Sequence, residues 1–322
     1  MTQSIPTVHL DTVLANHTRD MKGRIAAVTG TTSGTGYVCA RELAKRGAIV
    51  VLLNRASPRA DSSLQALKGE VPNGEFHPVT CDLQHFASVR KAIKEIQANA
   101  SRLDVLCNNA GVMALKDEAT RDGYDVQMQT NCISHFLLTK GLFDLLRASD
   151  DARIVNHSSM ARIGPPLQAK YFGKNGGNLG GDGDEQEGFG GPRWDRYHQT
   201  KLANLAFTYG LKQRLDKAGI KNVKALLAHP GLARTQLAFT TERDGGMDAS
   251  SPFMNQAQSA EDGATGIIRA CMDPNAKSGH FYGPKEWTGF PVLLRPEADL
   301  NTSENIRVNW EGCGAAVGKF FI

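Results

Sequence analysis

The sequence lacks the long hydrophobic runs that membrane-spanning and secreted proteins carry. Its longest apolar run covers only residues 48–53, whereas a helix that crosses a bilayer needs about 20 apolar residues. Residues 1–22 are polar and mixed in charge, so they do not contain the apolar stretch of a secretory signal. These absences exclude a membrane span and predict a cytoplasmic protein.

Cysteine is sparse, and its positions form no pattern. Six residues of 322 are cysteine, and no two of them form a CxxC pair. Disulfide frameworks and zinc sites need paired spacings, so neither is predicted, no metal site is assigned, and a reducing compartment is expected. The cysteines are Cys39, Cys81, Cys107, Cys132, Cys271 and Cys313.

Charge of either sign is not in marked excess. The net charge is +4, and the basic residues are scattered along the chain. Proteins that bind nucleic acid carry clustered lysine and arginine, so nucleic acid is not an expected partner.

Short apolar segments alternate with helical segments through most of the chain. With 41% apolar and 22% charged residues, the composition is that of a protein with a core. The alternation predicts a parallel sheet covered by helices on both faces. The predicted strands are 25–29, 49–53, 75–80, 103–107, 153–156, 223–227 and 280–282. The predicted helices are 37–46, 88–98, 124–146, 196–218 and 260–272.

We therefore predict an α/β fold with one doubly wound domain over residues 22–290 and a mostly parallel, seven-stranded sheet. Residues 1–21 form an N-terminal extension in this interpretation, and residues 291–322 form a C-terminal extension that packs on the domain. The apolar tail at 317–322 is suited to dock on the domain or on a partner.

Two segments interrupt the alternation. Residues 173–191 hold nine glycines in nineteen residues, which predicts a flexible, irregular insertion. Its acidic residues match no 12-residue calcium loop, so a solvated loop is favoured. Residues 236–255 mix Gly, Asp, Ser and Pro with Phe and Met, which predicts a substrate loop or lid.

A glycine-rich turn, TGTTSGTG at residues 29–36, joins the first predicted strand to the first predicted helix. Free N–H groups and the helix dipole at such a junction favour a phosphate, and glycine allows its close approach. The alternative is a small-residue turn without a ligand, but the strand and helix context favours nucleotide binding. The predicted ligand residues are Gly30, Thr32, Ser33, Gly34, Thr35 and Gly36.

The end of the second strand indicates which nucleotide the site prefers. An NAD site has an acidic residue there, which accepts a hydrogen bond from the ribose 2′-hydroxyl. Here the strand ends Leu53-Asn54-Arg55, without a carboxylate. Neutral Asn54 and cationic Arg55 suit the 2′-phosphate of NADP(H), which a carboxylate would repel. The alternative is that Arg55 is only a solvated loop residue.

Further polar motifs follow the later strands, and their order is more informative than any one of them. Parallel strands bring their carboxyl ends to one edge of a sheet, so these motifs are expected around a single site. There, Asp82 can bond an adenine amino group, and residues 108–111 can line the cofactor. In chain order the motifs are Asp82-Leu83, Asn109-Ala110-Gly111, Asn131, Ser158-Ser159, Tyr197 with Lys201, and Pro230-Gly231 with Thr235.

With these motifs in this order, the chain resembles the short-chain dehydrogenase/reductase superfamily over residues 22–290. The phrases QTNCISHFLLT, RIVNHSS, KLANLAFT and HPGLART are most similar to its retinol dehydrogenase-like and WW domain-containing oxidoreductase-like group, although no WW domain is present. Protochlorophyllide reductases are related and also carry an insertion before the catalytic tyrosine. The resemblance implies a Rossmann fold, and members of this superfamily are often dimers or tetramers.

Tyr197 and Lys201 form the predicted acid–base pair. Four residues apart on a helix, they project from one face. A free phenol has a pKa of about 10, which a nearby ammonium and a cationic nicotinamide are expected to lower. By resemblance, Lys201 also bonds the nicotinamide ribose, Ser159 rather than Ser158 holds the substrate oxygen, and Asn131 organises a water relay.

One departure from the family pattern concerns spacing. Ser159 and Tyr197 are 38 residues apart, which is longer than in compact members, and the glycine-rich insertion accounts for the surplus. The two side chains can meet if the insertion loops outward.

Other candidates have simpler interpretations. His198 adjoins Tyr197, but helix neighbours point about 100° apart, so a direct role is not expected. His135, His157 and His229 are assigned structural roles because no metal-ligand spacing links them. In the predicted lid, Phe239, Phe253 and Met254 line an apolar substrate pocket or pack in the core.

Together these features predict an NADP(H)-dependent oxidoreductase that transfers hydride between the nicotinamide and a carbonyl or alcohol of a lipophilic small molecule, with reduction favoured where NADPH is abundant. One alternative is reduction of a C=C bond in a conjugated ring, as in the protochlorophyllide relatives. Another is a non-catalytic cofactor-binding module, which predicts loss of a catalytic group. The substrate and the choice between homodimer and homotetramer stay open.

Overall fold

The computed structural model describes residues 5–183, 189–319 and 322, and their core is one eight-stranded sheet. The strand order is β3-β2-β1-β4-β5-β6-β7-β8, and every neighbouring pair is parallel except β7 with β8. The chain therefore winds outward in both directions from β1 and β4, which creates a crevice between their carboxyl ends. The strands are β1 (Ile25–Thr29), β2 (Ile49–Asn54), β3 (Glu75–Thr80), β4 (Val105–Asn108), β5 (Ala152–His157), β6 (Val223–Ala228), β7 (Phe281–Gly283) and β8 (Val292–Leu294).

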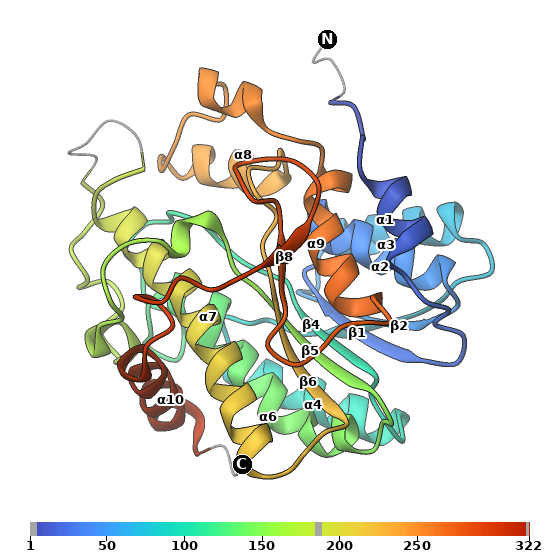
Figure 1. Cartoon of the computed structure of the whole chain (residues 1–322). Coiled ribbons are helices and arrows are strands. Elements are labelled where there is room, and N and C mark those ends of the chain that lie inside the picture. The colour runs from blue at the N-terminus through green and yellow to red at the C-terminus, as the bar shows by residue number, and fades with distance from the viewer. Residues whose placement is uncertain (1–4, 184–188, 320–321) are drawn as a thin grey trace.

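Helices cover both faces of this sheet (Figure 1). Side chains alternate between the faces along each strand, so Val50 and Leu52 enter one core while Val51 and Leu53 enter the other. One face carries α1 (Leu10–Asn16), α2 (Gly34–Lys45), α3 (Pro58–Glu70) and α9 (Ala260–Met272). The other carries α4 (Phe86–Asn99), α5 (Val126–Met128), α6 (Ser134–Arg147), α7 (Pro192–Lys217) and α10 (Ser303–Val317).

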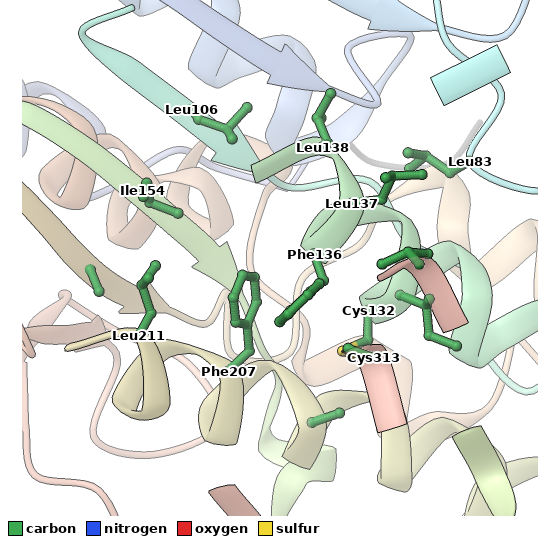
Figure 2. Packing of buried hydrophobic residues seen from close by; sticks show 14 of the residues in the cluster. Leu83, Leu106, Cys132, Phe136, Leu137, Leu138, Ile154, Phe207, Leu211 and Cys313 are labelled. Carbon is green, nitrogen blue, oxygen red and sulfur yellow. Dashed lines mark hydrogen bonds between the residues drawn. The ribbon is translucent and has the colours of Figure 1, made fainter. Parts of the chain in front are cut away.

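The core beneath α6 and α7 is closely packed. Figure 2 shows Phe136 of α6 facing Phe207 of α7, with ring centroids 5.1 Å apart. Cys132 and Cys313 lie beside them, with their sulfur atoms 3.9 Å apart, so α10 is joined to this core by direct contact. The aromatic contact packs α7, which carries Tyr197 and Lys201, against α6.

The predicted doubly wound fold is confirmed, but the predicted strand count was wrong. The eighth strand, β8, has three residues and lies at the sheet edge, where Val292 and Leu293 are exposed. A strand this short has no buried face to reveal it in the sequence, and only its pairing with β7 defines it. It joins the sheet from within the segment expected to be a C-terminal extension.

Helix α3 was not predicted, because only Ser63 and Leu67 of its residues are buried and its apolar pattern is weak. A local signal was present, since Ser57 caps the helix and Pro58 occupies its first turn.

The predicted helix over 124–146 is confirmed as helical structure from Val126 to Arg147, but its winding changes within it. A π-helical turn, η1 (Gln129–Ile133), separates α5 from α6 and contains Asn131. The loop expected over 236–255 likewise contains a helix, α8 (Gln236–Arg243), and a short 3-10 turn, η4 (Pro252–Gln256).

Candidate active site

A cleft of about 710 Å³ opens at the carboxyl ends of the central strands. Its position matches the crevice between β1 and β4, where open α/β sheets bind their ligands. Strand ends and the glycine-rich turn form one half, and residues near α7, α8 and η4 form the other.

The glycine-rich turn has positions that only glycine can occupy. A Cβ atom on Gly36 would lie 2.3 Å from both the Gly30 carbonyl oxygen and the Asn109 amide nitrogen, so only glycine fits there. Gly30 has a φ of +72°, which also favours glycine. Helix α2 begins at this turn, and its N-cap residue, Ser33, makes no side-chain cap hydrogen bond. Its first N–H groups are therefore available to an anion.

Two side chains brace this turn. The Asn54 carbonyl oxygen accepts a hydrogen bond from the Thr31 N–H at 2.8 Å, and its amide nitrogen donates to the Thr31 hydroxyl at 2.8 Å. Asn109 donates to the Thr29 carbonyl oxygen at 2.9 Å and accepts from the Thr35 hydroxyl at 2.9 Å. Asn54 lines the cleft, but its amide is engaged in holding the turn.

The structure adds a second arginine to the predicted cofactor site. Arg59, in the first turn of α3, lines the cleft with Arg55 and hydrogen-bonds the Ser33 hydroxyl. Sequence reasoning missed Arg59 and Ser57 because it did not recognise α3. The Ser-Pro-Arg sequence at that helix start was the available signal.

The other predicted cofactor residues also line the cleft. Thr235 lies across from Gly34, since a Cβ on that glycine would be 3.2 Å from the Thr235 methyl carbon. Gly231, with a φ of +63°, is enclosed by the Trp287 carbonyl, which would lie 2.4 Å from an added Cβ. The remaining lining residues of this set are Gly30, Thr32, Ser33, Thr35, Asp82, Leu83, Asn109, Ala110, Gly111 and Pro230. Gly36 is not among them and instead lies beneath the turn.

Ser159, Tyr197 and Lys201 meet in the cleft. The Ser159 hydroxyl hydrogen-bonds the Tyr197 phenol. The Lys201 ammonium lies 5.6 Å from the centre of the tyrosine ring and donates to the His157 carbonyl oxygen at 3.1 Å. The insertion leaves the serine and the tyrosine in contact despite their separation in the sequence.

Asn131 lies behind these three residues and is fully buried. Its amide nitrogen donates to the Val112 carbonyl oxygen at 2.8 Å and to the Thr200 hydroxyl at 2.9 Å, and its carbonyl oxygen accepts the Val112 N–H at 2.8 Å. These bonds fix the loop after β4 against α7. The predicted water relay stays a prediction.

Burial shifts the pKa of both Tyr197 and Lys201. It raises the pKa of Tyr197 to about 12, although the Ser159 hydrogen bond acts in the opposite direction. Burial also lowers the pKa of Lys201 to about 8. In the protein alone, loss of hydration dominates and the ammonium bonds a carbonyl oxygen. The lowering of the phenol pKa by Lys201 together with a cationic nicotinamide stays a prediction.

The histidines near the site hold backbone segments in place. The two ring nitrogens of His198 lie 2.7 Å from the Ala161 carbonyl oxygen and 2.8 Å from that of Pro165. His135 lies 2.9 Å from the Thr29 hydroxyl, and burial lowers its pKa to about 4. Burial likewise lowers the pKa of His157 and brings that of His229 to about 3.

Buried side chains hold the described part of the insertion. The Asp117 carboxylate accepts backbone N–H groups of Gly177, Leu179 and Gly181 at 2.6–3.0 Å. The Arg196 guanidinium, fully buried, lies 3.7 Å from that carboxylate and donates to the Gly181 carbonyl oxygen at 2.8 Å. The predicted irregular path is confirmed for residues 173–183. The predicted flexibility is not confirmed there, since the Arg196 bonds tie this segment to α7. The acidic residues Asp184, Glu185 and Glu187 lie outside the described residues.

Two of the three candidate pocket residues of the lid segment line the cleft. These are Phe253 and Met254, whereas Phe239 lies on α8 with 44% of its surface exposed and is not among the lining residues. Trp194 was not predicted and lines the same half.

Three cysteines that are distant in the sequence meet in the core. The sulfur atoms of Cys39, Cys107 and Cys271 lie within 4.8 Å of one another, and all three residues are fully buried. The spacing argument missed this cluster because α2, β4 and α9 each supply one residue. Buried thiols of this kind pack as small apolar groups.

Within the described ranges, no helix combines the length and the apolarity needed to cross a membrane.

Comparison with known proteins identifies the family. The family description "short chain dehydrogenase" matches residues 24–173. The chain is 34% identical to the chloroplastic short-chain dehydrogenase TIC 32 A of Brassica napus, over 69% of this chain and 67% of that protein. The chain belongs to the short-chain dehydrogenase/reductase family.

Other relatives agree with this assignment. The chain is 36% identical to the uncharacterized oxidoreductase C736.13 of Schizosaccharomyces pombe, over 69% of this chain and 64% of the relative. It is 34% identical to human retinol dehydrogenase 13, over 68% of this chain and 62% of that protein. The resemblance to the retinol dehydrogenase-like group is confirmed, and the match spans less than two thirds of these two relatives.

Solved structures show the same short-chain dehydrogenase fold. An uncharacterized protein from Mycobacterium paratuberculosis superposes with a TM-score of 0.74 at 28% identity, over 96% of this chain and 98% of that one. A short chain dehydrogenase from Escherichia coli CFT073 complexed with NADPH gives a TM-score of 0.60 at 21% identity. The superposition covers 81% of this chain and 97% of that one.

Proposed function

We propose that this protein is an NADP(H)-dependent oxidoreductase that interconverts a carbonyl and an alcohol on a lipophilic small molecule. The observation that carries the proposal is the meeting of Ser159, Tyr197 and Lys201 in a cleft whose other half contains the glycine-rich turn. The catalytic domain in this proposal covers residues 22–290, and the protein is cytoplasmic.

The cofactor half fits NADP(H). Gly30, Gly34 and the start of α2 would hold the pyrophosphate, because the turn has no side chain that would obstruct it. Arg55 and Arg59 would hold the 2′-phosphate, since both guanidinium groups belong to the cleft and β2 ends without a carboxylate. The bound cofactor supplies or accepts the hydride.

The chain's own residues handle the proton. Because the pKa of Tyr197 is raised to about 12, the phenol carries its proton at neutral pH and can donate it to a carbonyl oxygen. The Ser159 hydroxyl, already bonded to that phenol, is placed to bind the same oxygen. Lys201 would hold the nicotinamide ribose and restore the proton. A protonated phenol favours carbonyl reduction.

The substrate half favours a lipophilic molecule. Its lining includes the side chains of Met113, Trp194, Leu237, Met247 and Phe253. Burying such surface against a ligand is favourable by about 25 cal/mol for each Å² removed from water.

The test is NADPH consumption with a panel of lipophilic aldehydes and ketones, with NADH for comparison. Turnover that needs NADPH and disappears in Tyr197→Phe supports the proposal. NADPH binding without turnover of any carbonyl would contradict it.

Reduction of a C=C bond is the second candidate, because the insertion contributes Phe189 to the cleft as a ring-binding surface. The same assay with conjugated rings, in light and in darkness, separates the two reactions.

A further inference from the structure

Five aromatic rings form a continuous chain along the substrate half of the cleft. Tyr197 and Trp194 belong to α7, Phe189 to the insertion, Phe253 to η4, and Trp287 to the loop between β7 and β8. Successive ring centroids are 5.8, 4.7, 4.9 and 5.3 Å apart, and the planes meet at angles of 83°, 77°, 66° and 90°. The chain begins at Tyr197 and ends at Trp287.

The outer rings of this chain are not covered by the protein. Phe189 is 46% exposed and Trp287 is 48% exposed, whereas the core pair Phe136 and Phe207 is at most 1% exposed. Rings whose only role was to pack in the core would be buried as fully as Phe136 and Phe207. Exposed aromatic surface in a cleft indicates a surface that a ligand covers.

Among the residues that the structure describes, the lining of this half carries no charge beyond Lys201. Among the described residues that line the cleft, the other charged side chains are Arg55, Arg59 and Asp82, at the cofactor end. The ligand of the aromatic half therefore has no ionic partner among the described residues, which favours an uncharged ligand, since burying an unpaired charge is costly.

The inner part of the chain is held rigidly. The Trp194 indole N–H donates to the Gly246 carbonyl oxygen at 3.1 Å, and the neighbouring Arg193 guanidinium lies 3.1 Å from the Asp244 carboxylate. These bonds fix the start of α7 to the end of α8. A fixed ring keeps its edge and face in position, so a ligand ring meets a preformed contact.

Edge-to-face packing favours aromatic over saturated ligands. A ring's positive edge attracts the negative face of the next ring, which a saturated ring of the same size does not offer. We propose that the substrate is an uncharged aromatic carbonyl compound whose ring continues this chain while its carbonyl reaches Tyr197 and Ser159. The inference rests on the proposed carbonyl chemistry and adds the nature of the substrate body.

The test compares 4-phenylbutan-2-one with 4-cyclohexylbutan-2-one. Both are isolated methyl ketones, so their carbonyl groups react alike and only the ring differs. Each edge-to-face contact changes a dissociation constant by a factor of about two to twelve. We therefore expect the KM of the phenyl ketone to be about tenfold lower than that of the cyclohexyl ketone.

Phe253→Leu and Trp287→Leu remove rings while keeping apolar side chains. We expect the KM of the phenyl ketone to rise about fivefold to tenfold in each. The KM of the cyclohexyl ketone should rise less, because it loses only apolar contact area, so the preference for the phenyl ketone should fall. The control is Phe239→Leu, which removes an exposed phenylalanine of α8 outside the cleft lining and should leave both KM values unchanged.

Equal KM values for the two ketones, or a preference that survives in both leucine variants, would overturn the aromatic assignment and leave the carbonyl chemistry standing. If neither ketone turns over, their dissociation constants from tryptophan fluorescence decide the matter. A phenyl preference that Phe253→Leu removes then supports the aromatic surface while contradicting the proposed reaction, and equal constants overturn the inference.

Discussion

The cofactor half and the substrate half of the cleft are built in different ways. The cofactor half consists of strand ends and one tight turn, and short motifs such as Asn109-Ala110-Gly111 supply its side chains. The substrate half gathers single residues from the insertion, α7, η4 and the loop before β8. The comparison teaches that a site made of backbone geometry leaves a local signature, whereas a surface made of scattered side chains does not.

Tyr197 stands where the two halves meet, so its removal should separate chemistry from binding. Tyr197→Phe deletes the proton donor, and we expect kcat to fall about 10²–10⁴-fold, the usual contribution of a general acid. The NADPH dissociation constant should change little, because Arg55, Arg59 and the glycine-rich turn are untouched. Steady-state kinetics and fluorescence titration measure the two values. A variant that retains more than a tenth of the activity would contradict the assigned role.

Acid should act first on the cofactor half, which holds three buried neutral histidines. The native pKa is lowered for His157, to about 4 for His135 and to about 3 for His229. Unfolded histidine titrates near pH 6.5, so below that pH the unfolded chain binds protons that the native chain does not. The free energy of unfolding should therefore fall as pH drops from about 6 toward about 4, by about 1.4 kcal/mol per pH unit for each histidine whose native ring stays neutral. Asp125 acts in the opposite direction, because burial raises its native pKa to about 6.

Urea unfolding at several pH values measures this slope. In His135→Asn the slope should decrease by about 1.4 kcal/mol per pH unit. The reason is that the unfolded chain then binds one proton fewer, while the number bound by the native chain is unchanged. The control His77→Asn changes a histidine exposed on β3 and should leave the slope unchanged. An unchanged slope in His135→Asn would contradict the assignment of a buried neutral ring.

Cofactor preference tests whether the second arginine belongs to the cofactor half. Arg59→Ala should raise the KM for NADPH about 10- to 100-fold, because a hydrogen bond to a charged group contributes about 1.5–3 kcal/mol. The KM for NADH, which has no 2′-phosphate, should stay the same. Arg90→Ala, an exposed arginine of α4, is the control. Equal losses for both cofactors would mean that Arg59 supports the turn through Ser33 instead.

Loosening the insertion should affect only the substrate half. Asp117→Asn weakens the bonds to three backbone N–H groups and the pairing with Arg196, so we expect a loss of about 1–3 kcal/mol in stability. The KM for the carbonyl substrate should rise a few-fold while NADPH affinity is kept. Its exposed neighbour provides the control, Glu118→Gln. A matching loss of NADPH affinity would show that the halves are not independent.

Local sequence was sufficient for seven strands of the sheet and for the glycine-rich turn. Buried strands such as 49–53 are continuous apolar runs, and a turn that must approach a phosphate needs glycine at particular positions. Both requirements concern residues that are close together in the sequence, so a local sequence pattern is enough to predict the strands and the turn. Helix α3 shows the limit, because its weak apolar face hid Arg59 despite the Ser57 cap.

Only the tertiary structure decided the substrate half and the protonation of the pair. The aromatic chain joins residues from Phe189 to Trp287, and no local pattern requires them to meet. The raised pKa of Tyr197 depends on burial, which is a property of everything packed around the phenol. Contacts between distant segments and exclusion of water are collective effects, and for that reason they became apparent only in the folded chain.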